Sequence, residues 1–285
     1  MRWQDMRQSE NVEVRGSGGG FPLGGIPLGG GALLVVVVVS LLFGINPLEI
    51  LGLMSGGGGN PAVQQSAPQT TEDVRNYPGY PFVSRILGDT EDFWSKTFSA
   101  NGDRYVPPRL VLYHNSTQSA CGTAQAAVGP FYCPGDHEVY LDTAFFDELA
   151  RRFGAPGQFA QAYVIAHEIG HHVQNLSGTM SKFDAQAQRA DPRERNALSV
   201  RLELQADCYA GVWAASARQR GLIDTSDVEG GLRAAAAVGD DMITKGRVPP
   251  DAFTHGTAAQ RTHWFKVGLD SGDMRQCSTF AQLTP

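Results

Sequence analysis

Residues 159–176 read Phe-Ala-Gln-Ala-Tyr-Val-Ile-Ala-His-Glu-Ile-Gly-His-His-Val-Gln-Asn-Leu, and no other stretch says as much about the architecture. The stretch contains no proline and is apolar on both sides of His-Glu-Ile-Gly-His, so it predicts an α-helix of about five turns. Residues four apart share one face of a helix, which places His167 and His171 one above the other. Apolar flanks indicate burial, and buried polar side chains need partners. We therefore expect a central helix that carries a polar site.

The spacing of the two histidines is typical of a zinc site. Two imidazoles one helical turn apart can reach the same metal ion. Glu168 lies beside that ion without binding it, where it can take a proton from a zinc-activated water. A surface helix with solvated side chains is the alternative, and the apolar flanks argue against it. The motif predicts a zinc-dependent peptidase with His167 and His171 as ligands and Glu168 as general base.

The third ligand must come from outside the motif, because a catalytic zinc has three protein ligands and one open position. The common extension that ends in a further histidine is absent, since position 177 is Ser. The Ala- and Leu-rich run 196–216 predicts a second long helix, with Glu203 and Asp207 on one face. We expect Glu203 to bind zinc and Asp207 to hold a ligand histidine by its free ring N–H. Rival ligands lie in the polar stretch 181–195, which reads as a loop or exposed segment: Asp184, Asp191 and Glu194.

The chain resembles the putative neutral zinc metallopeptidase family, a set of bacterial membrane-anchored proteins. The matching segments span nearly the whole chain: 1–4, 119–122, 129–134, 163–174, 203–208, 254–257 and 259–261. The resemblance implies a zincin-like fold, Zn²⁺ as cofactor, and a protein or peptide as substrate. It also implies that His167, His171 and Glu203 are the zinc ligands. It does not identify which protein or peptide is cleaved, and because the family's name rests largely on the motif, the name is no independent proof of proteolysis.

Composition divides the chain into four parts. The 285 residues leave room for one sizeable domain plus appendages, and a net charge of -6 without a basic run argues against nucleic acid as a partner. Residues 1–20 form a polar N-terminal segment, and 21–45 contain no charged side chain. Residues 46–74 are rich in Gly, Pro, Ser and Thr, which predicts a flexible linker. Residues 75–285 form the expected metallopeptidase domain.

The uncharged segment 21–45 is long enough to span a bilayer as a transmembrane helix. A buried core helix or a cleaved signal peptide is the alternative, but the upstream chain is long for a signal peptide. Arg2, Arg7 and Arg15 precede the segment, and the next basic residue is Arg75. The positive-inside rule then keeps the N-terminus in the cytoplasm. We expect a single-pass protein of the bacterial inner (cell) membrane, with its catalytic domain periplasmic or extracellular.

The four cysteines fit an exported domain and allow three pairings. We favour Cys121–Cys133, which closes a short loop, and Cys208–Cys277, which ties the C-terminal tail to the ligand-bearing helix. A separate thiolate zinc site is disfavoured because no C-x-x-C pair exists. Free buried thiols become the default if the topology prediction is wrong.

The rest of the pattern predicts an α+β domain that is mostly helical, with a small sheet before the active helix. In zinc peptidases generally, a strand at the cleft edge pairs with extended substrate. The strand near 137–141 is our candidate for that role, and an ordinary core strand fits the pattern equally well. The expected strands are 109–113 and 138–141, and the expected helices are 85–99, 143–153, 226–245 and 257–268.

Peptide hydrolysis also needs a donor that stabilises the oxyanion. His255, in Thr-His-Gly-Thr at the start of a helix, is our candidate, and a surface residue beside a helix cap is its alternative. Arg261 could position His255 or pair with a carboxylate. His172 follows a ligand directly, so it points off the zinc face and packs or bonds elsewhere.

The leading hypothesis is a membrane-anchored zinc-dependent endopeptidase. A zinc-stabilised, non-catalytic binding protein of the cell envelope is the alternative, although such a scaffold gains nothing from the carboxylate of Glu168. A zinc hydrolase of non-peptide substrates is a third possibility, because substrate specificity depends on pocket residues that the motif does not identify.

Overall fold

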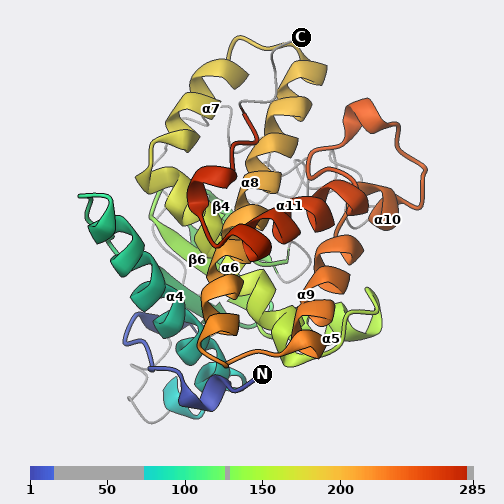
Figure 1. Cartoon of the computed structure of the whole chain (residues 1–285). Helices are drawn as coiled ribbons and strands as arrows, with labels where there is room; N and C mark the ends of the chain where they lie inside the picture. Colours follow the sequence, from blue (N-terminus) through green and yellow to red (C-terminus); the bar gives the residue numbers. More distant parts are fainter. Residues whose placement is uncertain (16–73, 126–128, 281–285) are drawn as a thin grey trace, which may run out of the picture.

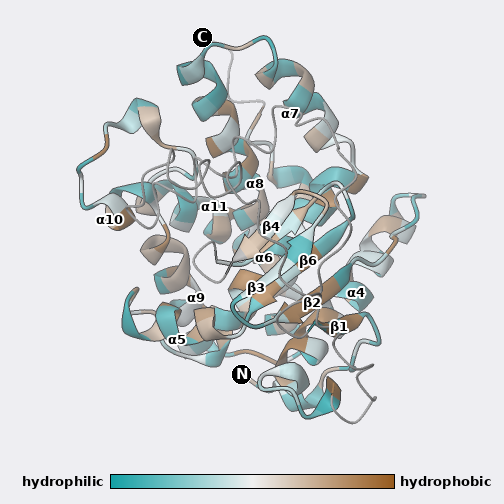
Figure 2. Cartoon of the chain, turned by 180° about the vertical axis from the view of Figure 1, so that it is seen from behind, coloured by the Kyte–Doolittle hydropathy of each residue, from teal (hydrophilic) through white to brown (hydrophobic). Residues whose placement is uncertain are grey.

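The computed structural model describes residues 1–15, 74–125 and 129–280. Its α+β fold places a small sheet on one side of a group of helices (Figures 1 and 2). The strands are β1 (Val12–Arg15), β2 (Arg109–Tyr113), β3 (Ser116–Ser119), β4 (Gly122–Gln125), β5 (Phe131–Cys133) and β6 (Glu138–Asp142). The α-helices are α4 (Tyr80–Ala100), α5 (Ala144–Arg151), α6 (Gln158–Leu176), α7 (Thr179–Ala187), α8 (Pro192–Gln219), α9 (Thr225–Ala237), α10 (Asp240–Thr244) and α11 (Ala258–Ser271). Short 3-10 turns are η1 (Trp3–Asp5), η3 (Pro250–Ala252) and η4 (Met274–Gln276).

The main sheet has the strand order β1-β2-β6-β5. β1, β2 and β6 run parallel, and β5 runs antiparallel to β6. Residues 110–113 of β2 are fully buried, as expected for a strand covered on both faces, and Figure 2 shows apolar colouring along β1 and β2. β6 has a neighbour on each side, so it is an interior strand. Of the two alternatives for the strand near 137–141, the structure therefore favours the ordinary core strand over a strand that pairs with substrate.

Helix α6 is the central helix, and its side chains are buried on all sides, as a core helix requires. It packs against α8, which in turn crosses α11 (Figure 1). The crossing is very close because Gly211 and Gly268 stand where any Cβ would collide with the backbone of the other helix. This close crossing fixes the side chains of α8 and α11 relative to one another.

The N-terminal residues are part of this domain. β1 pairs with β2 over four residue pairs, from Val12 with Leu110 onward. The buried carboxylate of Glu91 on α4 also accepts hydrogen bonds from Arg7, Ser9 and Asn11. Residues 1–20 were expected to lie apart from the domain, as a cytoplasmic N-terminal segment. The pairing shows only that residues 12–15 belong to the same sheet as residues 110–113.

The expected fold class needs a further correction, because it included a transmembrane helix. No helix within residues 1–15, 74–125 and 129–280 is both long enough and apolar enough to cross a membrane. The predicted anchor, 21–45, and the predicted linker up to residue 73 lie outside the described residues. The residues that the structure describes form an α+β fold with a small sheet.

Most of the predicted elements are confirmed within a few residues, and two are wrong. The predicted helix 226–245 is broken at Gly239, where a Cβ would collide with the backbone of Ala258. The stretch 181–195, predicted as a loop, contains most of α7 and the start of α8. In α8 this start is fixed by a capping box between Asp191 and Glu194.

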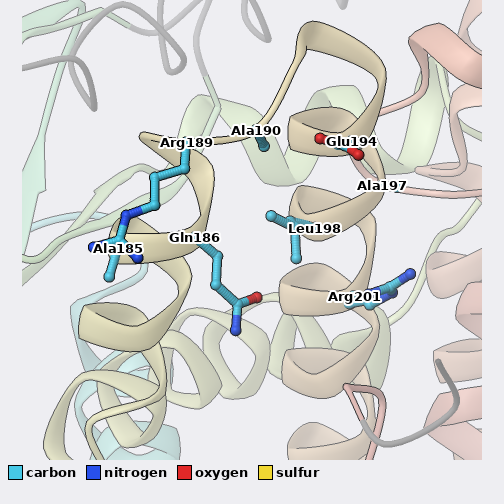
Figure 3. Close-up of a pocket in the computed structure, with 8 residues that line it drawn as sticks. All are labelled: Ala185, Gln186, Arg189, Ala190, Glu194, Ala197, Leu198 and Arg201. Atoms are coloured by element: carbon cyan, nitrogen blue, oxygen red, sulfur yellow. The ribbon is translucent and has the colours of Figure 1, made fainter. Parts of the chain in front are cut away.

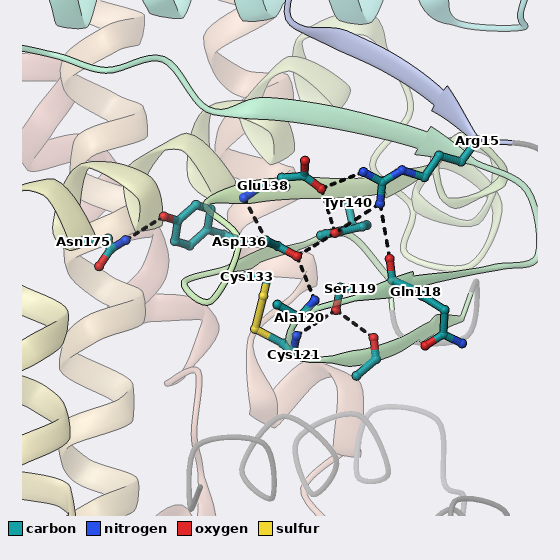
Figure 4. Close-up of a disulfide and its surroundings, with 12 residues drawn as sticks. Arg15, Gln118, Ser119, Ala120, Cys121, Cys133, Asp136, Glu138, Tyr140 and Asn175 are labelled. Carbon is teal, nitrogen blue, oxygen red and sulfur yellow. Dashed lines mark hydrogen bonds and ion pairs between the residues drawn. A yellow bond between two sulfur atoms is a disulfide. The ribbon is translucent and has the colours of Figure 1, made fainter. Parts of the chain in front are cut away.

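The structure contains the two disulfides that the sequence favoured. Cys121–Cys133 joins the β3–β4 hairpin to β5. Figure 4 shows Asp136 beside this disulfide, where it accepts hydrogen bonds from the Ala120 backbone N–H and the Tyr140 hydroxyl. Cys208–Cys277 ties η4 to α8, and both of its residues are buried.

Candidate metal and catalytic site

Two helices bring the predicted site residues together. α6 carries His167, Glu168 and His171, and α8 carries Glu203 and Asp207. The approach of α8 depends on Gly170, because a Cβ at this position would lie only 2.9 Å from the carbonyl oxygen of Ala206. The glycine inside the His-Glu-Ile-Gly-His string thus lets the second helix bring its carboxylates over the first.

His167, His171 and Glu203 form a compact set of metal-binding atoms. The Nε2 atoms of His167 and His171 lie 3.2 and 3.4 Å from the two carboxylate oxygens of Glu203. Atoms bonded to one tetrahedral zinc ion at about 2.1 Å lie about 3.4 Å apart. Two nitrogens and one carboxylate are also a donor set that zinc prefers in catalytic sites. The residues present therefore fit a zinc ion.

The ring of His167 is held by a buried charged network. Its Nδ1 lies 2.9 Å from Oδ1 of Asp207. The same carboxylate accepts two hydrogen bonds from Arg261, at 2.8 and 2.9 Å, and one from the hydroxyl of Tyr163. Asp207, Arg261 and Tyr163 are at most 3% exposed. The network occupies Nδ1 and leaves Nε2 of His167 directed at Glu203.

The ring of His171 is held by amides instead of charges. Its Nδ1 lies 2.9 Å from Oε1 of Gln174. The Gln174 amide nitrogen donates to the carbonyl of Leu202 and to Oε1 of Gln205. Gln205 in turn donates to the carbonyl of Cys277 at 2.9 Å. These contacts again occupy Nδ1 and leave Nε2 facing Glu203.

Electrostatics favour a cation between these groups. Burial alone would lower the pKa of His167, but the carboxylates of Asp207 and Glu203 outweigh it and raise the value to about 10. Burial would likewise raise the pKa of Glu203, yet the nearby histidines His171 and His255 hold it well below its usual range. A carboxylate that stays ionised in a buried site attracts a positive charge, whether a proton or a metal ion.

Glu168 is only 7% exposed and makes no hydrogen bond with any residue in the described ranges. Burial raises the pKa of its carboxyl group above the ordinary value. A carboxylate that is poorly solvated and not neutralised by a hydrogen-bond donor is a stronger base. The environment of Glu168 therefore suits proton transfer.

His255 lies at the edge of this cluster and is oriented by Asp240. Its Nδ1 lies 3.1 Å from Oδ1 of Asp240, whose other oxygen accepts backbone N–H groups of Thr254, His255 and Gly256. Burial opposes a charge on His255, but Glu203 and Asp240 raise its pKa. Of the two roles expected for Arg261, the structure shows the pairing with a carboxylate, that of Asp207. Asp240, and not Arg261, positions His255.

Other predicted candidates lie away from the cluster. The expectation for His172 is confirmed, because its ring bonds the hydroxyl of Tyr132 and the carbonyl of Val106, and burial lowers its pKa to about 4. None of the rival ligands joins the metal-binding set found in the described ranges. Figure 3 shows a separate pocket between α7 and α8, and none of the proposed site residues lines it.

Four residues of the site were missed by the sequence analysis: Tyr163, Gln174, Gln205 and Asp240. Gln174 follows His171 at a helical spacing of three, which was a usable signal. Gln205 lies between the two functional acids of α8, but its partner is distant in sequence. Asp240 was hidden within the run predicted as one helix, although the preceding Gly239 was a signal for a break.

The chain is similar to a known protein family and to bacterial proteins. A family model described as "Putative neutral zinc metallopeptidase" matches residues 1–280. The chain is 47% identical to "Uncharacterized protein YpfJ" of Escherichia coli over 290 residues, which cover 99% of both chains. It is 46% identical to "Uncharacterized protein Rv2575" of Mycobacterium tuberculosis over 191 residues, 62% of this chain and 64% of that one. No solved structure matches the chain.

Proposed function

Because the chain belongs to the putative neutral zinc metallopeptidase family, we propose that it is a zinc-dependent endopeptidase. The observation that carries the proposal is the arrangement around α6. His167, His171 and Glu203 converge on one point, and the unbonded carboxylate of Glu168 lies in the same buried site. A zinc site that serves stability alone does not need the carboxylate of Glu168.

In this proposal His167, His171 and Glu203 hold the zinc ion, and Asp207 and Gln174 orient the histidines. Zinc, when bound, supplies a Lewis acid that makes water a nucleophile at neutral pH. Glu168 accepts the proton of the attacking water and then delivers it to the leaving amine. The raised pKa of Glu168 lies closer to neutral pH, which favours both acceptance of the proton from water and its delivery to the amine.

His255 is proposed to stabilise the negative charge that develops on the substrate carbonyl oxygen. Asp240 engages Nδ1, and Nε2 makes no hydrogen bond within the described residues, so Nε2 is free to donate. The raised pKa of His255 favours the protonated, donating form. The role requires an oriented ring: three backbone N–H groups fix the Asp240 carboxylate, and its Oδ1 in turn holds Nδ1 of His255.

The decisive experiment compares the intact chain with its Glu168→Gln variant, both loaded with zinc, on an unfolded protein substrate. Loss of a general base should slow cleavage by about 10²- to 10⁴-fold while bound zinc is unchanged. Glu229→Gln, on the exposed surface of α9, is the matched control and should cleave normally. If wild type and Glu168→Gln both bind zinc and neither cleaves, the endopeptidase proposal fails in favour of a zinc-stabilised binding protein.

The intact chain is needed because β1 is a strand of the domain's sheet. A fragment that begins at residue 74 would lack β1 and would expose the edge of β2. An exposed strand edge promotes aggregation. Inactivity of such a fragment would therefore say nothing about the catalytic site.

We further propose that the domain works in an oxidising compartment of the cell envelope. Two disulfides support this, because structural disulfides persist in such compartments and are rare in reducing ones. Mass analysis of thiols alkylated directly in whole cells tests the proposal, and four freely alkylated cysteines would contradict it.

A further inference from the structure

The amide contacts behind His171 form a continuous path from the metal-binding cluster to the C-terminal disulfide. The path runs from His171 Nδ1 to Gln174, from Gln174 to Gln205, and from Gln205 to the carbonyl of Cys277. Its four groups come from three places in the fold: α6 carries His171 and Gln174, α8 carries Gln205, and Cys277 directly follows η4. We call it the glutamine relay.

The direction of the relay is fixed by backbone carbonyls. The carbonyl of Leu202 lies 2.6 Å from one end of the Gln174 amide and can only accept, so that end must be the nitrogen. The oxygen of Gln174 therefore faces His171. By the same reasoning the Cys277 carbonyl fixes the nitrogen of Gln205, and its oxygen faces Gln174. His171 must then donate through Nδ1–H, which leaves Nε2 as the metal-binding atom.

The relay is buried, so its bonds are not easily replaced by water. Gln174 is fully buried and Gln205 is 8% exposed. A buried amide that loses its partner bears a desolvation cost, and neighbouring hydrogen bonds strengthen one another. Each glutamine is thus held in a single orientation by the next group along the path.

The last acceptor is held in place covalently. Cys277 is bonded to Cys208, which lies one helical turn after Gln205 on α8. A further bond from the Thr279 hydroxyl to the carbonyl of Arg201, at 2.8 Å, keeps the same segment on α8. The disulfide therefore sets the position of the carbonyl that orients Gln205.

We propose that Gln174 and Gln205 are positioning residues that fix the tautomer of His171, and that the Cys208–Cys277 disulfide completes this support for the zinc site. The proposal rests on the proposed zinc site and deepens it. Loss of the relay lets the ring of His171 rotate or change tautomer, which weakens zinc binding. The protein's zinc affinity thereby depends on a disulfide that touches no zinc ligand.

The test is zinc affinity of the intact chain, measured by competition with a chromophoric chelator. Gln205→Met keeps length and volume but removes the amide, and we expect affinity to fall about tenfold or more. Gln161→Met is the matched control: Gln161 lies on α6, its side chain makes no hydrogen bond within the described residues, and the variant should bind zinc like wild type. The visible spectrum of bound Co²⁺ gives a second readout, and a changed spectrum in Gln205→Met alone is expected.

A double-mutant cycle tests the disulfide. Replacement of Cys208 and Cys277 by alanine should lower zinc affinity in wild type, and should lower it much less in Gln205→Met. Additive losses would overturn the disulfide link. Should the alanine pair fail to fold, selective reduction of the disulfide in each background replaces it.

Failure of the relay is distinguishable from failure of the proposed function. A wild type that binds no zinc overturns both. A wild type that binds zinc and cleaves substrate, beside a Gln205→Met variant with the same affinity and Co²⁺ spectrum, overturns the relay alone. Gln205→Asn, whose shorter amide cannot reach both partners, should behave like Gln205→Met if the relay acts as proposed.

Discussion

His167 and His171 lie on successive turns of α6, yet the two rings are supported by different chemistry. Behind His167 lie a carboxylate, a guanidinium and a phenol, contributed by α8, α11 and α6. Behind His171 lie two neutral amides and a backbone carbonyl. The metal-binding faces of the two rings are nevertheless alike, since both present Nε2 to Glu203.

Because one support is charged and the other neutral, the two should fail in different ways. Removal of one partner from a buried ion pair leaves an uncompensated charge, which costs much more than an unpaired amide. The charged network should therefore govern the stability of the helix core as well as the metal site. The glutamine relay should mainly tune the affinity for metal.

The largest expected effect comes from Asp207→Ala. Arg261 is 3% exposed and would lose its hydrogen-bonded carboxylate partner, with only the longer 3.8 Å ion pair to Glu203 left. We expect the free energy of unfolding to fall by about 3–5 kcal/mol. Denaturant unfolding of chelator-treated protein measures it. Gln174→Ala, on the neutral side, should cost about 1–3 kcal/mol, and equal losses would contradict the comparison.

A paired replacement sharpens this prediction. Asp207→Leu combined with Arg261→Met removes both charges from the core. Because no unpaired charge is left, the double variant should be more stable than Asp207→Ala, although it carries one more substitution. A double variant that is less stable than Asp207→Ala would show that the charges are not the dominant factor.

The second effect concerns stabilisation by zinc. Asp207→Asn weakens the hold on His167, and loss of such a partner lowers metal affinity about 10- to 100-fold. The gain in unfolding free energy on zinc saturation should then shrink by about 1.4–2.7 kcal/mol relative to wild type. Thermal or denaturant unfolding with and without zinc measures it. Asp184→Asn, on the exposed face of α7, should leave the gain unchanged.

The smallest effect is expected from Tyr163→Phe. The change removes one donor to Asp207, while Arg261 and His167 still satisfy that carboxylate. The cost should be about 1 kcal/mol of stability, with zinc affinity nearly unchanged. Tyr105→Phe is the matched control, because the hydroxyl of Tyr105 is buried without a hydrogen-bond partner in the described residues. Its removal should cost nothing, and a loss as large as that of Tyr163→Phe would contradict the prediction.

Much of the site could be predicted from sequence because helical spacing fixes it locally. His167 and His171 are four apart, as are Glu203 and Asp207, and each pair shares a helix face. The strand 109–113 was predicted to the residue, since Leu-Val-Leu-Tyr is a short apolar run that follows two prolines and is too short for a helix. Helical spacing and short apolar runs involve residues that are close in sequence, so they can be read from the sequence directly.

The parts that escaped prediction depend on contacts between distant segments. The carbonyl of Cys277 orients Gln205 across 72 positions of sequence, and no local pattern encodes that bond. Asp240 was missed because the helix break at Gly239 is imposed by the backbone of Ala258. β1 was missed for the same reason, as a four-residue strand has little signal without its partner.

The pairing of β1 with β2 has a consequence for the order in which the chain can fold. Val12 leaves the ribosome long before Leu110, its partner in the sheet. At typical rates of translation, β2 is synthesised on the order of 5 to 20 seconds after β1. Closing so long a loop is also slow, because chain entropy opposes it. The strand made first is therefore among the last to be placed, and β1 of the nascent chain stays unpaired and open to chaperones throughout that interval.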